Sequence, residues 1–149
     1  MTGYLVDTNV ISAAAPTATV KPIELIRWMD SHSHNLFLSA VSVAEITDGI
    51  ARLKRQGRDR KAADLSAWLE TVLHLYGERV LAFDSATAQI AGALSDLARS
   101  RGRPSGFADV IIAATARRHE LIILSRNERH FAPMDATVID PFRELPPDK

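Results

Sequence analysis

The feature that most constrains the fold is the alternation of very short apolar segments with longer stretches of helical spacing. The apolar segments cover residues 4–6, 36–38, 80–83, 121–124 and 138–139. Strands that are apolar throughout are typical of a parallel sheet with both faces covered, and alternation with helices favours a layered α/β fold. The sequence therefore predicts a mainly parallel four- to five-stranded sheet sandwiched by helices.

Helices are expected where apolar residues recur with the 3.6-residue period. These segments are residues 10–15, 23–29, 39–53, 59–76, 84–101 and 107–119. The last of them is apolar nearly all round, so we expect it to be buried. The chain shows no internal repeat, and 149 residues fit one domain. We place this domain at residues 1–142 and expect a loose tail at 143–149.

Composition and charge restrict the kinds of protein that this chain can be. Lys plus Arg and Asp plus Glu number 18 each, which argues against binding nucleic acid by bulk attraction but leaves a local basic groove open. Cysteine is absent, so a disulfide framework and a cysteine zinc site are excluded, and a cytoplasmic location is expected. We expect no signal peptide. We also expect no association with a membrane, because no apolar run reaches the roughly 20 residues that a spanning helix needs.

Three acidic residues are expected to meet at one edge of the sheet. Asp7 ends the first strand, Glu45 lies early in the helix after the second, and Asp109 begins the buried helix before the fourth. Ligands of open α/β sheets bind beyond the carboxyl ends of the strands. Carboxylates in one pocket repel one another unless a cation neutralises them, and hard divalent cations prefer oxygen ligands. The sequence therefore predicts a Mg²⁺ or Mn²⁺ site suited to phosphodiester hydrolysis.

Each acid also has a purely structural interpretation. Asp7 is a good helix cap, Ser42 and Glu45 have the spacing of a capping box, and Asp109 could complement a helix dipole. Asp84, after the third strand, has an equally good position, and we interpret it as a helix cap. Periodicity alone does not separate Asp84 from the other three acids.

Four ordered blocks of sequence carry a further signal: Tyr4–Ser12, Leu38–Ile46, Gly102–Pro104 with Asp109–Ala116, and Ser125–Phe131. Together they resemble the PIN-domain nucleases, and among these the VapC-type toxin ribonucleases of bacterial toxin–antitoxin pairs. The resemblance extends to about Phe142. It implies a Rossmann-like sandwich, divalent-metal catalysis, cleavage of RNA, neutralisation by a cognate antitoxin and a homodimer.

The resemblance also implies roles for individual residues. It places Asp7, Glu45 and Asp109 at the family's acidic metal-binding positions. It makes Thr8 a hydroxyl that supports the site and sets Asn127 in the family's Arg-Asn block. There the family usually has a fourth Asp before the Phe, and this chain has His130. An imidazole suits Mn²⁺ better than Mg²⁺, so a weak or missing second metal is one hypothesis, and a contact of His130 with phosphate or the leaving group is another.

Cations and apolar helix faces suggest partners. Arg103, Arg126 and Arg129 flank the predicted site and are candidates for contacts with RNA phosphates, which set affinity more than sequence specificity. The denser basic stretch at residues 52–61 is interpreted as a solvated helix end. Six apolar residues are candidates for an antitoxin groove, with core packing as the alternative: Leu25, Trp28, Met29, Ile46, Ile50 and Leu53.

Two other functions stay open. An aspartyl-phosphate phosphatase would also use Asp7 at a strand end, but it calls for an acid at position nine, which is Asn9. A catalytically weakened PIN-like module that binds RNA or a partner is favoured by His130, because a fold does not guarantee its activity.

Overall fold

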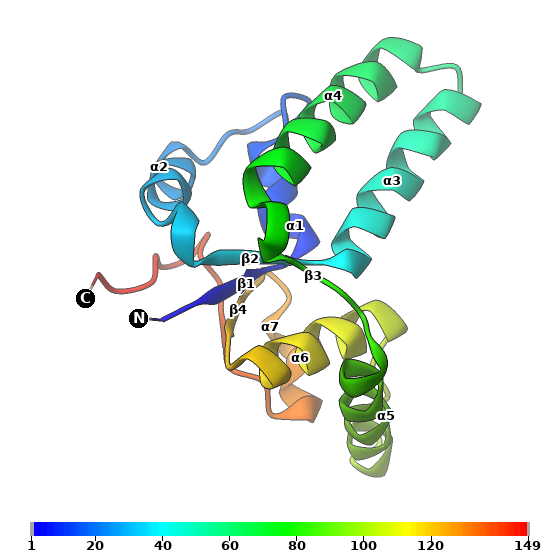
Figure 1. Ribbon diagram of the computed structural model, residues 1–149, viewed down its shortest axis with the longest axis vertical. Helices are drawn as coiled ribbons and strands as arrows, with labels where there is room; N and C mark the ends of the chain where they lie inside the picture. The colour runs from blue at the N-terminus through cyan, green and yellow to red at the C-terminus, as the bar shows by residue number, and fades with distance from the viewer. Residues whose placement is uncertain (1, 149) are drawn as a thin grey trace.

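Residues 2–148 of the computed structural model form a five-stranded parallel sheet between two layers of helices (Figure 1). The strands are β1 (Tyr4–Val6), β2 (Leu36–Ser39), β3 (Val80–Leu81), β4 (Ile122–Leu124) and β5 (Val138–Ile139). Their order in the sheet is β3-β2-β1-β4-β5, and every neighbouring pair is parallel. The predicted fold class is confirmed.

The helices divide between the two faces of the sheet. They are α1 (Thr8–Ile11), α2 (Ile23–Ser31), α3 (Ala40–Arg55), α4 (Asp59–Tyr76), α5 (Ser85–Ser100), α6 (Phe107–His119) and α7 (Glu128–Phe131). Helices α1 to α4 lie on one side and α5 to α7 on the other, and α3 and α4 form a hairpin that extends away from the sheet (Figure 1). Short 3-10 turns within residues 2–148 cover Ser12–Ala14, Ser33–Asn35, Gly77–Arg79 and Ala132–Met134.

The core has two parts because successive side chains of a strand point to opposite faces. In β1, Tyr4 and Val6 join the cluster beneath α2, α3 and α4, whereas Leu5 joins the cluster beneath α5 and α6. Helix α6 packs between the sheet and α5, and its residues Val110 to Ala116 are all buried. This position explains why its sequence lacks a polar face.

The strand order reverses next to β1, and this places distant residues side by side. Val6 pairs with Leu124 across β1 and β4. The residues that follow these two strands are therefore neighbours: the Asp7 amide donates to the Leu124 carbonyl at 2.9 Å, and Ser125 follows Leu124. Such a reversal point is where open α/β sheets bind their ligands.

Several boundaries differ from the sequence prediction. The third strand ends at Leu81 and not at residue 83, since Ala82 and Phe83 are exposed and outside the ladder. The fourth strand begins at Ile122, and the helix expected at residues 10–15 is α1 followed by a 3-10 turn. These are errors of a few residues at element ends, where local signals are weakest.

The C-terminal segment contacts the domain. Leu145 packs against the core and Pro146 is buried, and Asp148 Oδ1 lies 3.2 Å from His32 Nε2. The division of the chain at residue 142 stays a prediction, and Lys149 lies outside the described residues. No helix in the described part of the chain is long and apolar enough to cross a bilayer.

The proposed antitoxin groove is corrected by the fold. Five of its six candidate residues have at most 8% of their surface exposed and belong to the core between the sheet and α2 to α4: Leu25, Trp28, Met29, Ile46 and Ile50. Leu53 is partly buried against the same cluster. Core packing, the alternative interpretation, is correct for these side chains.

Candidate active site

Asp7 is a buried carboxylate at the carboxyl end of β1, with 5% of its surface exposed. Its Oδ1 accepts a hydrogen bond from the Thr8 amide at 2.8 Å, and its Oδ2 accepts one from the Ser125 hydroxyl at 2.6 Å. Burial raises the pKa of Asp7, the hydrogen bonds from Ser125 and Thr8 oppose the rise, and the charge of Asp109 adds to it. Asp7 therefore caps α1 and also presents a carboxylate that a cation would stabilise.

Glu45 is directed at α1 rather than at its own helix. Its Oε1 accepts a hydrogen bond from the Thr8 hydroxyl at 2.7 Å. The Ser42 hydroxyl lies 2.9 Å from Thr8 Oγ1, and since Thr8 has one proton to give, Ser42 is the donor there. The cap of α3 is Ser39, whose hydroxyl accepts from the Val41 amide at 3.1 Å. The capping-box interpretation of Glu45 is therefore wrong.

Asp109 lies in the first turn of α6, with its side chain 25% exposed. Its Oδ2 is 3.4 Å from Nδ1 of His130 in α7. Burial raises the pKa of Asp109, His130 acts in the opposite direction, and the charge of Glu45 raises it further. Gly106 occupies the capping position of α6 and has no side chain to cap with.

The three acids share one electrostatic neighbourhood, because Asp109 raises the pKa of Asp7 and Glu45 raises that of Asp109. Within residues 2–148, however, no three His, Asp or Glu side chains lie close enough together to hold a metal ion as they stand. The donor set, carboxylate oxygens with nearby hydroxyls, fits a hard divalent cation. The fit is thus one of donor chemistry, and the side chains would have to close around the ion.

Ser125 is a site residue that sequence reasoning missed. It is completely buried, donates to Asp7 Oδ2, and accepts a hydrogen bond from the Asn127 backbone amide at 3.0 Å. Asn9 also joins α1 to the segment after β4, since its Oδ1 accepts a hydrogen bond from the Arg126 amide at 3.2 Å. The available signal was the position of Ser125 directly after β4, the counterpart of Asp7 after β1.

Arg103 and Arg129 line a hollow of about 310 Å³ together with Asp109 and His130. Arg103 Nη2 donates to the Arg129 carbonyl at 3.3 Å, which ties the loop before α6 to α7. Arg126 lies outside this hollow, with its guanidinium carbon 3.9 Å from the centre of the Phe142 ring. Two of the three predicted phosphate contacts are therefore brought next to Asp109.

Asp84 is a helix cap, as predicted. Its Oδ1 accepts from the amide and the hydroxyl of Thr87, at 3.0 and 2.9 Å, and so caps α5. It also pairs with Arg118 in the last turn of α6. The Arg118 guanidinium, followed by Thr87, holds the pKa of Asp84 well below its usual range.

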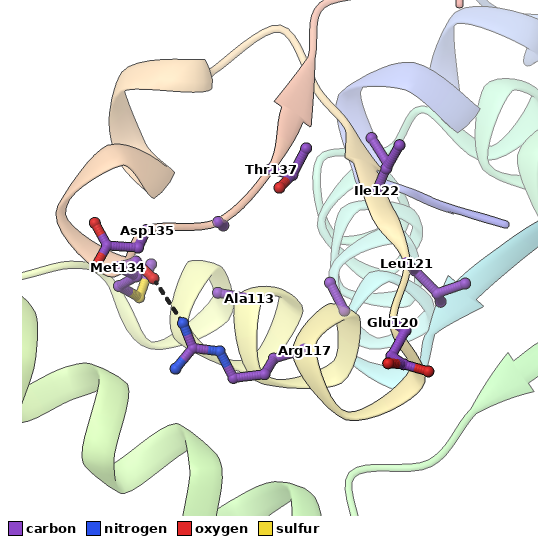
Figure 2. Close-up of a pocket in the computed structure, with 10 residues that line it drawn as sticks. Ala113, Arg117, Glu120, Leu121, Ile122, Met134, Asp135 and Thr137 are labelled. Carbon is purple, nitrogen blue, oxygen red and sulfur yellow. Dashed lines mark hydrogen bonds between the residues drawn. The ribbon is translucent and has the colours of Figure 1, made fainter. Parts of the chain in front are cut away.

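A further hollow, of about 270 Å³, lies at the amino end of β4 (Figure 2). Arg117 donates to the Met134 carbonyl across it at 3.4 Å. Its Asp135 is held by Arg101 through contacts of 2.8 and 3.0 Å. Because this hollow lies at the edge of the sheet opposite to Asp7, it is not part of the candidate site.

Comparison with known proteins gives one consistent family. The PIN domain family model matches residues 4–136. The toxin FitB of Neisseria gonorrhoeae is 34% identical over 142 residues, which are 94% of this chain and 99% of that protein. The VapC ribonuclease Y4jK of Sinorhizobium fredii is 32% identical and covers 93% of this chain and 96% of its own. The crystal structure of FitAcB from Neisseria gonorrhoeae superposes with a TM-score of 0.82 at 34% identity, over 93% of this chain and 98% of that one.

Proposed function

This chain belongs to the PIN domain family, in the group of VapC and FitB toxins, and we propose that it is an endoribonuclease that depends on Mg²⁺ or Mn²⁺ held by Asp7, Glu45 and Asp109. The observation that carries the proposal is that Thr8 hydrogen-bonds to both Asp7 and Glu45, which come from distant parts of the sequence, while the charge of Asp109 raises the pKa of Asp7. Burial and mutual repulsion make the ionised set unfavourable without a cation.

Each residue of the candidate site has its own proposed role in phosphodiester hydrolysis. A bound divalent cation would neutralise the acids and stabilise charge that develops on the scissile phosphate. Asp7 and Asp109, the two less exposed acids, are the proposed direct ligands. Ser125 and Thr8 fix the orientation of Asp7, and Thr8 also holds Glu45. Glu45 is exposed, and in this proposal it would ligate the cation or orient the attacking water.

The basic side chains around Asp109 bind the substrate in this proposal. Arg103 and Arg129 contact phosphates, because they line the same hollow as Asp109. His130, 3.4 Å from Asp109, contacts the scissile phosphate or the leaving oxygen. Asn127 occupies the N-cap position of α7, and its side chain makes no capping hydrogen bond, so in this proposal the side-chain amide of Asn127 contacts the substrate.

An antitoxin partner completes the proposal. FitAB is named as bound to a DNA fragment, and a structure of similar fold from Klebsiella pneumoniae is named as a toxin-antitoxin complex. We propose an antitoxin partner for the present chain as well. A cognate antitoxin would neutralise the toxin, and a basic antitoxin side chain placed among the acids could replace the charge of the cation. A homodimer is part of the same proposal.

Cleavage of single-stranded RNA by the purified chain tests the function. We expect cleavage with Mg²⁺ or Mn²⁺, none with a chelator, and a loss of at least about 100-fold for Asp7→Asn. Asp84→Asn is the matched control, because it changes an acid that also follows a strand but is already paired with Arg118. Equal cleavage under all conditions, or by Asp7→Asn, would contradict the proposal.

One alternative has an observation in its favour. His130 replaces the family's usual fourth acid, and within residues 2–148 no ready-made group of three metal-ligating side chains exists. A weakened module would bind RNA without turnover. The same assay separates the two functions, because binding without cleavage at any cation concentration would favour the module.

A further inference from the structure

A hollow of about 590 Å³, here called the second hollow, adjoins the candidate site, and we propose that it binds the RNA nucleotide that lies one position beyond those flanking the scissile phosphate. The inference rests on the proposed ribonuclease function. The hollow lies beside α7 and β5, and the residues that carry the argument are Arg126, Arg129, Ala132, Ala136, Val138 and Arg143.

Arg129 joins this second hollow to the active-site hollow, because it lines both. An RNA strand whose scissile phosphate lies near Asp109 and His130 can therefore pass Arg129 before it reaches the second hollow. A guanidinium binds phosphate through paired hydrogen bonds. Arg129 is thus placed to hold a phosphate between the two nucleotide positions.

The lining has the chemistry that an unstacked nucleotide needs. Ala132, Ala136 and Val138 supply small apolar surface, against which a base can lie flat. Bases of single-stranded RNA also stack on the planes of arginine side chains. The guanidinium of Arg126 is already held over the Phe142 ring at 3.9 Å, which lowers the entropy that would be lost when a base stacks on it.

The charge of the second hollow favours an anionic ligand. Within residues 2–148, none of Arg126, Arg129 and Arg143 is in an ion pair with a carboxylate. Its two acids each accept a hydrogen bond from a backbone amide but keep their negative charge, so the three arginines leave the hollow with a net positive charge. Glu128 Oε1 accepts from the Asp140 amide at 3.1 Å, and Asp140 Oδ1 accepts from the Phe142 amide at 2.9 Å. Unpaired cations around apolar surface fit a nucleotide better than an apolar peptide.

The C-terminal segment completes one side of the second hollow. Val138 and Arg143 lie beyond residue 136, where the match to the PIN domain model ends. Arg143 is positioned by a turn in which its amide donates to the Asp140 carbonyl at 3.2 Å. The segment after residue 142 therefore contributes a side chain to the RNA path.

Binding of labelled single-stranded RNA tests the inference, measured by fluorescence anisotropy in an Asp7→Asn background so that no cleavage interferes. We expect Arg143→Ala to weaken binding of an RNA of about twelve nucleotides by about tenfold, and Arg143→Lys to restore part of the loss. A dinucleotide, too short to reach the second hollow, should bind equally to both variants and to the parent. Arg60→Ala, which removes an exposed cation of α4, is the matched control.

The outcomes distinguish this inference from the proposed function. Equal binding by Arg143→Ala and Arg60→Ala overturns the inference, and so does a loss that is the same for the short and the long RNA. If the chain cleaves RNA while Arg143→Ala binds RNA normally, the ribonuclease function is supported and RNA binding in the second hollow is contradicted. If no cation supports cleavage while RNA binding depends on Arg143, RNA binding in the second hollow is supported and the catalytic proposal is contradicted. In the cleaving protein, Arg143→Ala should raise KM and leave kcat unchanged.

Discussion

Two hydroxyl groups hold the acids of the candidate site in place. Ser125 donates to Asp7 from the end of β4, and Thr8 donates to Glu45 from the start of α1. Each bond joins segments that are far apart in the sequence. Carboxylates that ligate metals depend on such partners for their orientation, so the hydroxyls should matter for activity although neither is a proposed ligand.

Ser125→Ala should lower RNA cleavage by about 10- to 100-fold, because it leaves Asp7 Oδ2 without its 2.6 Å partner. Cleavage rates at saturating cation, together with a urea unfolding curve, measure the effect on the folded protein. Ser100→Ala serves as the control, since that exposed serine bonds only to its own helix through the Leu97 carbonyl. A folded Ser125→Ala protein that cleaves like the parent would refute the positioning role.

His130→Asp should increase affinity for Mg²⁺ by about tenfold, because a carboxylate would replace an imidazole beside Asp109. Calorimetric titration with Mg²⁺ measures the change, and His34→Asp, at an exposed histidine in the 3-10 turn before β2, controls for added charge. If His130→Asp gains neither Mg²⁺ affinity nor activity, the missing fourth acid does not limit metal binding.

At the scale of elements, helix α6 links the site to the core. Its interior residues are buried between the sheet and α5, its first turn presents Asp109, and its last turn supplies Arg118 to Asp84. The same helix therefore carries one acid of the site and neutralises the acid that resembles it. Periodicity could not distinguish the two acids, because both lie at the start of a helix.

Asp84→Ala should destabilise the fold at neutral pH, since it removes the cap of α5 and the partner of Arg118. The pKa of Asp84 is held below its usual range, chiefly by Arg118. Its stabilising effect is therefore fully present above the unfolded pKa of about 4 and is lost as the pH falls from there through the lower folded value.

Urea unfolding of the parent and Asp84→Ala at neutral pH and near pH 3 checks this dependence. The difference in unfolding free energy should shrink at the lower pH. Asp96→Ala, at an exposed acid of the same helix, should show a smaller difference at neutral pH. An unchanged difference for Asp84→Ala at both pH values would contradict the assignment.

At the scale of the whole molecule, the layered fold was predictable because buried parallel strands must be apolar on both faces. The alternation of strands and helices fixed the sheet, and the positions of Asp7 and Asp109 at its carboxyl edge followed from topology. What sequence reasoning could not supply were contacts set by tertiary packing. Ser125 carries no periodic signal, and the capping-box spacing at Ser42 was overridden by the approach of Thr8.

Side-chain exposure was the other property that local patterns could not give. The apolar faces of α2 and α3 look the same whether they pack inward or await a partner, and the fold assigns them to the core. Likewise, the proline-rich composition after residue 142 did not indicate that Leu145 packs against the core. Both depend on which distant segments arrive to cover a surface.

The central claim is that Asp7, Glu45 and Asp109 bind one divalent cation together, and calorimetric titration with Mn²⁺ tests it most directly. The parent and Asp84→Asn should bind Mn²⁺ with the same affinity, whereas Asp7→Asn, Glu45→Gln and Asp109→Asn should each weaken binding by about tenfold or more. Mn²⁺ binding that is unaffected by Asp7→Asn and Asp109→Asn would contradict the account.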